Sequence, residues 1–225
     1  MRNSKIRFID LSQPLFNGIP LAGPLPRFQS HIYLSLEDGD TCNCYSSVLS
    51  DHTGTHCDAP FHVLPDGKTL DQYPVDACSG TAICLDVTEY DGKAITVEAM
   101  KEAESRCREM REGDVVLFCT GHSCHWDKRP DGMAYLQDRP WIDPAATQYL
   151  IDKKIKAIGI DVGGPDPLGA GHIVHDLLLS HEILIVETLT NLSAVVNKEF
   201  LFLAFPLKLT GTSGAPLRAV AMLEE

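Results

Sequence analysis

The residues best suited to chemistry gather in one short stretch of the chain, HTGTHCDAPFH at positions 52–62. This stretch holds three of the nine histidines together with one aspartate. Imidazole nitrogens and carboxylate oxygens are donors that zinc and manganese accept in proteins. Polar residues that only satisfy a turn seldom repeat in this way, so we interpret His52, His56 and Asp58 as ligands of a divalent metal.

The conformation expected for this stretch is extended or irregular. Two threonines and a glycine, which form helices poorly, lie between His52 and His56, and Pro60 would interrupt a helix. Side chains of an extended segment alternate between two faces. His56, Asp58 and His62 would then share one face, while Cys57 would lie on the other and be buried rather than bind metal.

A second group of donors occurs in HIVHDLLLSHEILIVE at positions 172–187. Glu187 follows the apolar run ILIV, and a carboxylate there is costly unless a cation meets it. A metal ion would supply that cation, and His175 is the histidine that we expect to join it. Structural or surface roles are expected for His172 and His181.

A third group, TGHSCHW, places His122 and His125 just after an expected strand, where an α/β sheet presents ligands. Either a pocket wall or the protein surface is compatible with these two histidines. Asp161 and Asp166 in IDVGGPDP are similarly open, because they could cap or turn the chain as easily as contact a substrate.

The composition excludes several classes of partner. With 31 acidic and 19 basic residues the net charge is −12, and no Lys or Arg cluster suits a phosphate backbone, so nucleic acid is not expected to bind. The apolar runs are far shorter than the roughly 20 residues that span a bilayer. The N-terminal sequence lacks the apolar core of a secretory signal, so we expect a cytoplasmic protein with no membrane contact.

The order of the expected elements indicates one α/β domain spanning residues 1–225. Strands and helices alternate between residues 114 and 189, which favours a mixed sheet that is parallel at least in part. The flanking strands suggest added antiparallel strands or a partial barrel. Thr96 and Asp143 are expected to cap two of the helices. The expected helices are 97–111, 144–152 and 172–181, and the expected strands are 6–11, 45–50, 82–88, 114–120, 156–162, 183–189, 199–207 and 216–222.

The stretch HTGTHCDAPFH matches every fixed position of HxGTHxDxPxH, the signature of the metal-dependent cyclase-like hydrolases. The chain resembles this family, which includes bacterial kynurenine formamidases and isatin hydrolases, in three further segments: LPDGKTLDQYP, KAIGIDVGGPDP and PLKLTGTSGAPLRAVAM. The resemblance implies a swivelling β/β/α fold. It also implies assembly as a homodimer or homotetramer.

The same resemblance implies roles for individual residues. The metal ligands that it implies are His52, His56, Asp58, His175 and Glu187. The last two would join Asp58 around a second ion in two-metal members, and His62 would transfer a proton. The expected cofactor is Zn or Mn, as one or two ions per chain.

The predicted reaction is hydrolysis of a carbon–nitrogen bond in an amide, formamide or lactam. A metal ion with an open coordination position lowers the pKa of its water from about 15.7 toward about 7, and the hydroxide so formed would attack the carbonyl carbon. His62 would protonate the leaving nitrogen, and general acid catalysis of this kind is typically worth about 10² to 10⁴ in rate.

Two other functions stay open on the sequence. A non-catalytic metal-dependent binding protein would keep the donors but would have no need of His62. A non-haem iron oxygenase could use His52, His56 and Asp58 as its two-histidine, one-carboxylate ligand set. The second donor group and His62 favour hydrolysis over both.

The substrate is expected to be a small aromatic amide or lactam, because Phe61 and Trp126 offer stacking surface for a planar ring. Kynurenine formamidases commonly carry a tryptophan-containing WPGD-like stretch near the N-terminus, where this chain has IPLAGPLPRF. His122 stands where many relatives have tryptophan, which would make the pocket wall more polar. We therefore expect kynurenine formamide to be at most one substrate among several.

Overall fold

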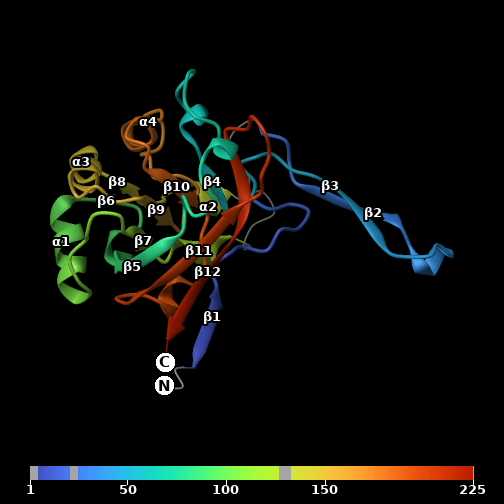
Figure 1. The fold of residues 1–225 in the computed structure, drawn as a ribbon, viewed down its shortest axis with the longest axis horizontal. Coiled ribbons are helices and arrows are strands. Elements are labelled where there is room, and N and C mark those ends of the chain that lie inside the picture. The colour runs from blue at the N-terminus through green and yellow to red at the C-terminus, as the bar shows by residue number, and fades with distance from the viewer. Residues whose placement is uncertain (1–4, 21–24, 127–132, 225) are drawn as a thin grey trace.

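The computed structural model describes residues 5–20, 25–126 and 133–224. An eight-stranded sheet curls into a barrel, with helices on one side and a long hairpin projecting from the other (Figure 1). The strands of this sheet are β1 (Ile6–Asp10), β4 (His56–Asp58), β5 (Gly80–Asp86), β7 (Val115–Cys119), β9 (Ala157–Ile160), β10 (Leu184–Glu187), β11 (Glu199–Pro206) and β12 (Gly214–Glu224).

The strand order is β1-β12-β11-β5-β7-β9-β10-β4, and β4 also pairs with the beginning of β12. This second pairing closes the barrel, while β1 pairs with the far end of β12. The pairs β5–β7, β7–β9 and β9–β10 are parallel, and the other pairs of the sheet are antiparallel. The predicted α/β fold with a mixed sheet is confirmed.

Helices α1 (Val97–Arg106), α3 (Pro144–Asp152) and α4 (Ile173–Ser180) lie along one side of the barrel (Figure 1). The predicted N-caps are present, because the side chains of Thr96 and Asp143 accept hydrogen bonds from backbone N–H groups of the first turns. None of the described helices has the length and apolar character needed to cross a bilayer. The shorter elements are α2 (Met133–Leu136), the paired strands β6 (Ala94–Ile95) and β8 (Trp141–Ile142), and 3-10 turns at Leu36–Asp38, Pro60–His62, Leu70–Gln72, Thr88–Tyr90, His122–His125 and Leu192–Ala194.

Helix α1 is shorter than the predicted 97–111. Cys107 leaves the helical conformation, with φ −120° and ψ −89°. The Glu104 carboxylate accepts hydrogen bonds from the backbone N–H of Met110 at 2.6 Å and from the Tyr149 hydroxyl at 2.8 Å. These side-chain hydrogen bonds hold the chain after residue 106 out of the helix. Helix propensity alone does not predict them.

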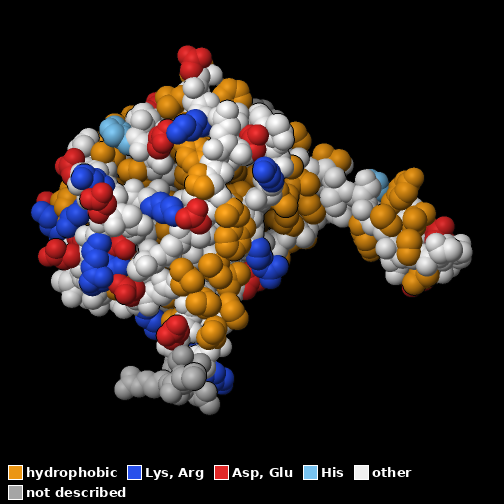
Figure 2. Space-filling view, in the orientation of Figure 1, with side chains coloured by type: hydrophobic (Ala, Val, Ile, Leu, Met, Phe, Trp, Pro, Cys, Tyr) orange, Lys and Arg blue, Asp and Glu red, His pale blue; other side chains and the backbone are white. Residues whose placement is uncertain are grey.

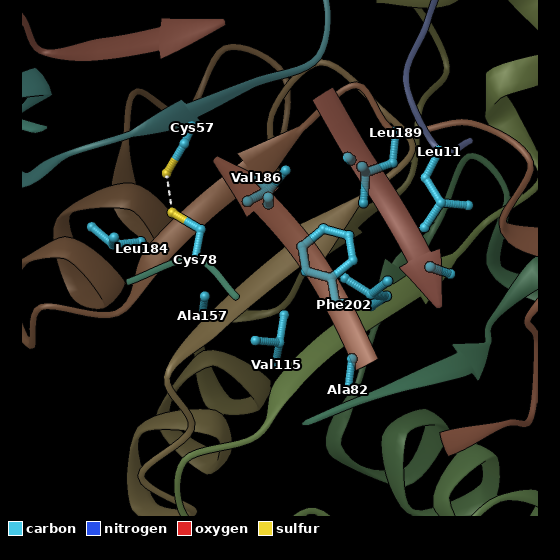
Figure 3. Packing of buried hydrophobic residues seen from close by; sticks show 14 of the residues in the cluster. Leu11, Cys57, Cys78, Ala82, Val115, Ala157, Leu184, Val186, Leu189 and Phe202 are labelled. Carbon is cyan, nitrogen blue, oxygen red and sulfur yellow. Dashed lines mark hydrogen bonds between the residues drawn. The ribbon is translucent and has the colours of Figure 1, made fainter. Parts of the chain in front are cut away.

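Apolar side chains cover both faces of the central strands. Val115 and Phe202 pack inside the barrel (Figure 3), whereas Ile158 and Leu178 belong to a second core beneath the helices. Burial on both faces explains why these strands are apolar at successive positions.

Strand β4 shows the predicted alternation between two faces. Cys57 is fully buried in the barrel core, where its Sγ lies 3.0 Å from Sγ of Cys78 (Figure 3). Its neighbours His56 and Asp58 therefore point to the opposite side of the strand, toward helix α4. The prediction that Cys57 is buried is confirmed.

A hairpin made of β2 (Gln29–Leu34) and β3 (Cys44–Val48) extends away from the barrel (Figure 1). The strand predicted at 45–50 is present, but it belongs to this separate sheet and all five residues of β3 are exposed. Apolar side chains cover much of the hairpin in Figure 2. Tyr33 and Tyr45 are 70% and 65% exposed, which leaves this surface without a partner in the described chain.

Candidate metal centre

Donor side chains from four segments converge beside strand β4. His56 lies on β4, and Glu187 at the end of β10 is its partner in the antiparallel pairing. His52 precedes the strand and His175 lies in the first turn of α4. Donor atoms lie within 4.8 Å of one another in two sets that share Asp58, namely His52, His56 and Asp58, and Asp58, His175 and Glu187. A third set at the same distance joins His62 and His172 to His175.

The two sets share Asp58, whose side chain is fully buried. Its Oδ1 lies 2.7 Å from His52 Nδ1 and 3.2 Å from His56 Nε2. Its Oδ2 lies 3.4 Å from His175 Nε2, and that nitrogen lies 3.0 Å from Glu187 Oε1. Asp58 thus turns one carboxylate oxygen toward each set, as a bridging ligand would.

Hydrogen bonds on the outer side of the site orient two of these rings. His56 Nδ1 donates to the backbone carbonyl of Gly54 at 2.7 Å. His175 Nδ1 donates to the carboxylate of Asp166, which also accepts from the backbone N–H of Val174. In both rings Nε2 is consequently the nitrogen that faces the carboxylates, an arrangement typical of histidines that bind metal.

The third ring, that of His52, is oriented by a chain of two hydrogen bonds. Ser213 Oγ donates to Asp51 Oδ2 at 2.7 Å, so it can accept from His52 Nε2 at 2.8 Å. This leaves the lone pair of His52 Nδ1 directed at Asp58 Oδ1. Lone pairs of three imidazoles and two carboxylates therefore face one another, and a cation is needed between them.

The electrostatics of the site agree with this need for positive charge. Burial alone would lower the pKa of His56, but the charges of Asp58 and Glu187 raise it to about 9. Burial alone would raise the pKa of Asp58, but the charge of His56 holds it well below its usual range. Asp58 Oδ2 is buried and has no hydrogen-bond partner in the described chain. The residues present therefore fit a divalent metal, which would satisfy that oxygen.

His62 lies at the edge of the donor sets. The 3-10 turn at Pro60–His62 interrupts the predicted extended segment, yet the ring centroid of His62 lies 4.1 Å from that of His52 and 5.5 Å from that of His175. Its ring nitrogens bond to none of the described residues, and the ring lines a cavity. Burial lowers the pKa of His62, so its neutral form is favoured.

The donors open onto a cavity of about 460 Å³, a size common for small-molecule sites. Trp126, Tyr135 and Leu136 form an apolar wall, and Ile19 and Leu25 belong to the lining as well. The last two come from the IPLAGPLPRF stretch, of which residues 21–24 lie outside the described part of the chain. Trp126 is therefore the tryptophan that lies beside the metal donors, and the N-terminal stretch contributes aliphatic side chains instead.

Two other side chains predicted to contact substrate are not among those that line this cavity. Phe61 lies in the turn at Pro60–His62 and is 42% exposed. His122 is buried behind the wall, with Nδ1 at 2.9 Å from Asp91 Oδ1 and Nε2 at 3.0 Å from the Tyr135 carbonyl. Neither side chain lines the cavity beside the metal donors, and contact of either one with substrate stays a prediction.

The remaining candidates have distinct places. His172 is exposed and lines the cavity, and His181 is exposed at the end of α4. The rings of His122 and His125 are in edge contact, 4.9 Å apart. The Asp161 carboxylate accepts three hydrogen bonds from residues 120–121, so it holds the ends of β7 and β9 together.

Sequence reasoning missed Ser213, Asp51 and Arg139. Ser213 is 161 positions from His52, so spacing could not reveal their contact. Its segment, TGTSGAP, stands out in the sequence through the family resemblance alone. Arg139 follows an apolar, helical segment and carries no local signal, although its side chain lines the cavity.

Fold and site together define an α/β metalloprotein. Carboxylates and imidazoles meet where the parallel strands β9 and β10 end, which is the edge at which such sheets commonly place their sites.

The chain belongs to the cyclase family, whose model matches residues 9–167. It is 33% identical over 216 residues to a kynurenine formamidase of Bacillus mycoides (strain KBAB4), covering 95% of this chain and 96% of that protein. Among solved structures it is similar to isatin hydrolase A from Labrenzia aggregata bound to benzyl benzoate, with a TM-score of 0.86, 28% identity and coverage of 98% and 94%. An isatin hydrolase bound to the product analogue thioisatinate gives a TM-score of 0.89 at 25% identity, with coverage of 98% and 93%.

Proposed function

We propose that the chain is a metal-dependent hydrolase that cleaves the carbon–nitrogen bond of an aryl formamide or a fused lactam. The observation that carries this proposal is the pair of donor sets sharing Asp58, with His62 beside them and open to the cavity. Similarity to a kynurenine formamidase and to isatin hydrolases supports the same class of reaction on bonds other than peptide bonds.

Zn or Mn would be held by His52, His56 and Asp58, and a second ion by Asp58, His175 and Glu187. A bound divalent ion would lower the pKa of water and polarise the scissile carbonyl. Asp58 belongs to both donor sets, which supports two ions per chain rather than one. Gly54, Asp166 and Ser213 would keep the three imidazole rings aimed at the ions.

His62 is the residue that we assign to proton transfer. Its neutral ring can accept a proton from the attacking water and return it to the leaving nitrogen, which is a poor leaving group unless it is protonated. Because its nitrogens have no acceptor in the described chain, the ring is available to do so. His62 lies against His52 and His175 without belonging to the two donor sets that share Asp58.

The cavity supports an aromatic substrate. Trp126 and Tyr135 pack edge to face, 5.2 Å apart, and present apolar surface beside the donors. A planar ring fits against such a wall. An oxygenase could use His52, His56 and Asp58 alone, but it has no need of the second donor set or of His62.

We further propose that the chain assembles as a homodimer or homotetramer. A two-stranded hairpin is marginally stable by itself in water, so the exposed apolar surface of β2 and β3 is expected to pack against another copy. Analytical ultracentrifugation, which measures the mass of the assembly in solution, tests this proposal.

A cytoplasmic location stays a prediction from the sequence.

The experiment that tests the proposed reaction is a comparison of kcat/KM for N-formylkynurenine, isatin and an aliphatic amide on metal-replete protein. Turnover of at least one aromatic substrate, abolished by chelation and restored by metal, is expected. A preference for the aliphatic amide would contradict the aromatic pocket. Turnover that requires oxygen would favour an oxygenase.

A further inference from the structure

Arg139 is a cavity residue that the proposed reaction does not yet use. Apart from histidines, it is the one basic side chain among the described residues that line the cavity. Its side chain is partly buried, and burial lowers its pKa, although Glu187 and Asp166 oppose that effect. A guanidinium stays charged even when it is partly buried, so the cavity wall carries a fixed positive charge.

Two glycines hold this guanidinium close to the metal donors. Arg139 Nη1 donates to the backbone carbonyls of Gly163 and Gly164, in the IDVGGPDP segment after β9. Gly164 has φ +103°, and a Cβ there would lie 2.7 Å from Arg139 Nη1 and 3.4 Å from Glu187 Oε1. Arg139 and Glu187 therefore lie on either side of Gly164. A small molecule is long enough to reach both Arg139 and the donor sets.

The remaining donors of Arg139 have no partner in the described chain. Its Nε and Nη2 groups bond to no acceptor there, and no carboxylate of the described residues lies within ion-pair distance. Asp58, Asp166 and Glu187, the acidic side chains of the cavity, already face the histidines. A partly buried guanidinium that forms no ion pair with the described residues is costly, and its planar fork matches a carboxylate.

We propose that Arg139 binds a carboxylate of the substrate, so that the site selects anionic aryl amides over neutral ones. This inference rests on the proposed function and adds a substrate class to it. The ring would lie against Trp126 and Tyr135, with the scissile carbonyl toward the donor sets and the carboxylate toward Arg139.

The test compares two substrates that differ in one group, 2-formamidobenzoate and 2-formamidobenzamide, on metal-replete protein. Wild type should prefer the carboxylate by about 10- to 100-fold in kcat/KM, as expected for one charge-assisted interaction. Arg139→Gln should remove that preference, mainly through KM, and should change the rate on the carboxamide less than about threefold. Arg139→Lys, which keeps the charge but loses the fork, should retain part of the preference.

Arg111→Gln is the matched control, because it removes one positive charge from a side chain that is 67% exposed and does not line the cavity. It should leave both rates unchanged. Equal losses on the two substrates in Arg139→Gln would overturn the proposal and assign Arg139 to holding Gly163 and Gly164. If wild-type protein hydrolyses the two substrates equally well, the proposal is overturned before any variant is measured.

A binding measurement separates this inference from the proposed function. If metal-replete wild type hydrolyses neither substrate, the proposed reaction is wrong. Calorimetric titration with anthranilate and anthranilamide still tests Arg139 in that case. Preference for anthranilate that is lost in Arg139→Gln supports the anion site, and equal preference in the two proteins overturns it.

Discussion

Replacing Gly214 with alanine tests whether strand β4 must approach β12 closely to place the metal ligands. Gly214 lies opposite Asp58 in the β12–β4 pairing. A Cβ at this position would lie 2.7 Å from the carbonyl oxygen of Cys57 and 3.0 Å from His52 Cε1. The first of these contacts is with backbone, so β4 itself would have to move.

The size of the effect follows from that contact. Overpacking of a tight site costs about 1–3 kcal/mol. At about 2–4 °C per kcal/mol for a domain of this size, Gly214→Ala should lower Tm by about 2–12 °C. Because the same shift displaces His52 and Asp58, we expect metal to bind about 10- to 100-fold more weakly, as when an outer hydrogen-bond partner of a ligand is lost.

Gly113→Ala is the control for this prediction. Gly113 has φ +84° and open space around its Cβ position, so alanine strains the backbone there without contacting the site. Competition with a chromogenic chelator measures metal affinity in both variants. Gly113→Ala should lose stability and keep wild-type affinity, whereas Gly214→Ala should lose both. Wild-type affinity in a destabilised Gly214→Ala protein would refute the link between barrel closure and metal binding.

Three further outcomes are expected. His62→Ala should retain its metal while kcat falls by about 10² to 10⁴, and a wild-type rate would remove its role. His175→Ala and Glu187→Gln should each lower the metal content found by elemental analysis; a higher Tm with unchanged metal would instead indicate a structural carboxylate. Asp71 accepts a hydrogen bond from Gly211 N–H, which lowers the pKa of the Asp71 carboxyl below its ordinary value of 3.8. The ionised carboxylate therefore stabilises the fold at pH values above 3.8, and this stabilisation is lost as the pH falls and the carboxylate is protonated. Asp71→Ala should therefore lower Tm at pH 7, with a difference from wild type that closes in acid; a constant difference would contradict this.

The sequence alone was sufficient to predict features that depend on residues close together in the chain. The caps at Thr96 and Asp143 follow from side chains that bond within one helical turn. The opposite directions of Cys57 and Asp58 follow from the alternation of an extended strand. Glu187 could be singled out because a carboxylate that follows four apolar residues is costly to bury unless a cation meets it.

Features that depend on contacts between distant segments could not be predicted. The bond between Ser213 and His52, and the approach of Arg139 to Gly163 and Gly164, arise from the closed barrel. His122 follows a strand end, as a site residue would, but its contacts with Asp91 and the Tyr135 carbonyl bury it behind the cavity wall. The direction in which each of these side chains points, and the partner that it meets, depends on the fold.

The measurement that tests the metal-dependent reaction most directly is the rate of aryl formamide hydrolysis by chelator-treated protein as Zn or Mn is added back in known amounts. The rate should be near zero without metal, rise with each addition and level off at one or two ions per chain. Asp58→Asn, which loses the bridging charge, should not recover over the same range. Full activity without metal, or none after two ions are bound, would contradict the assignment of this site to hydrolysis.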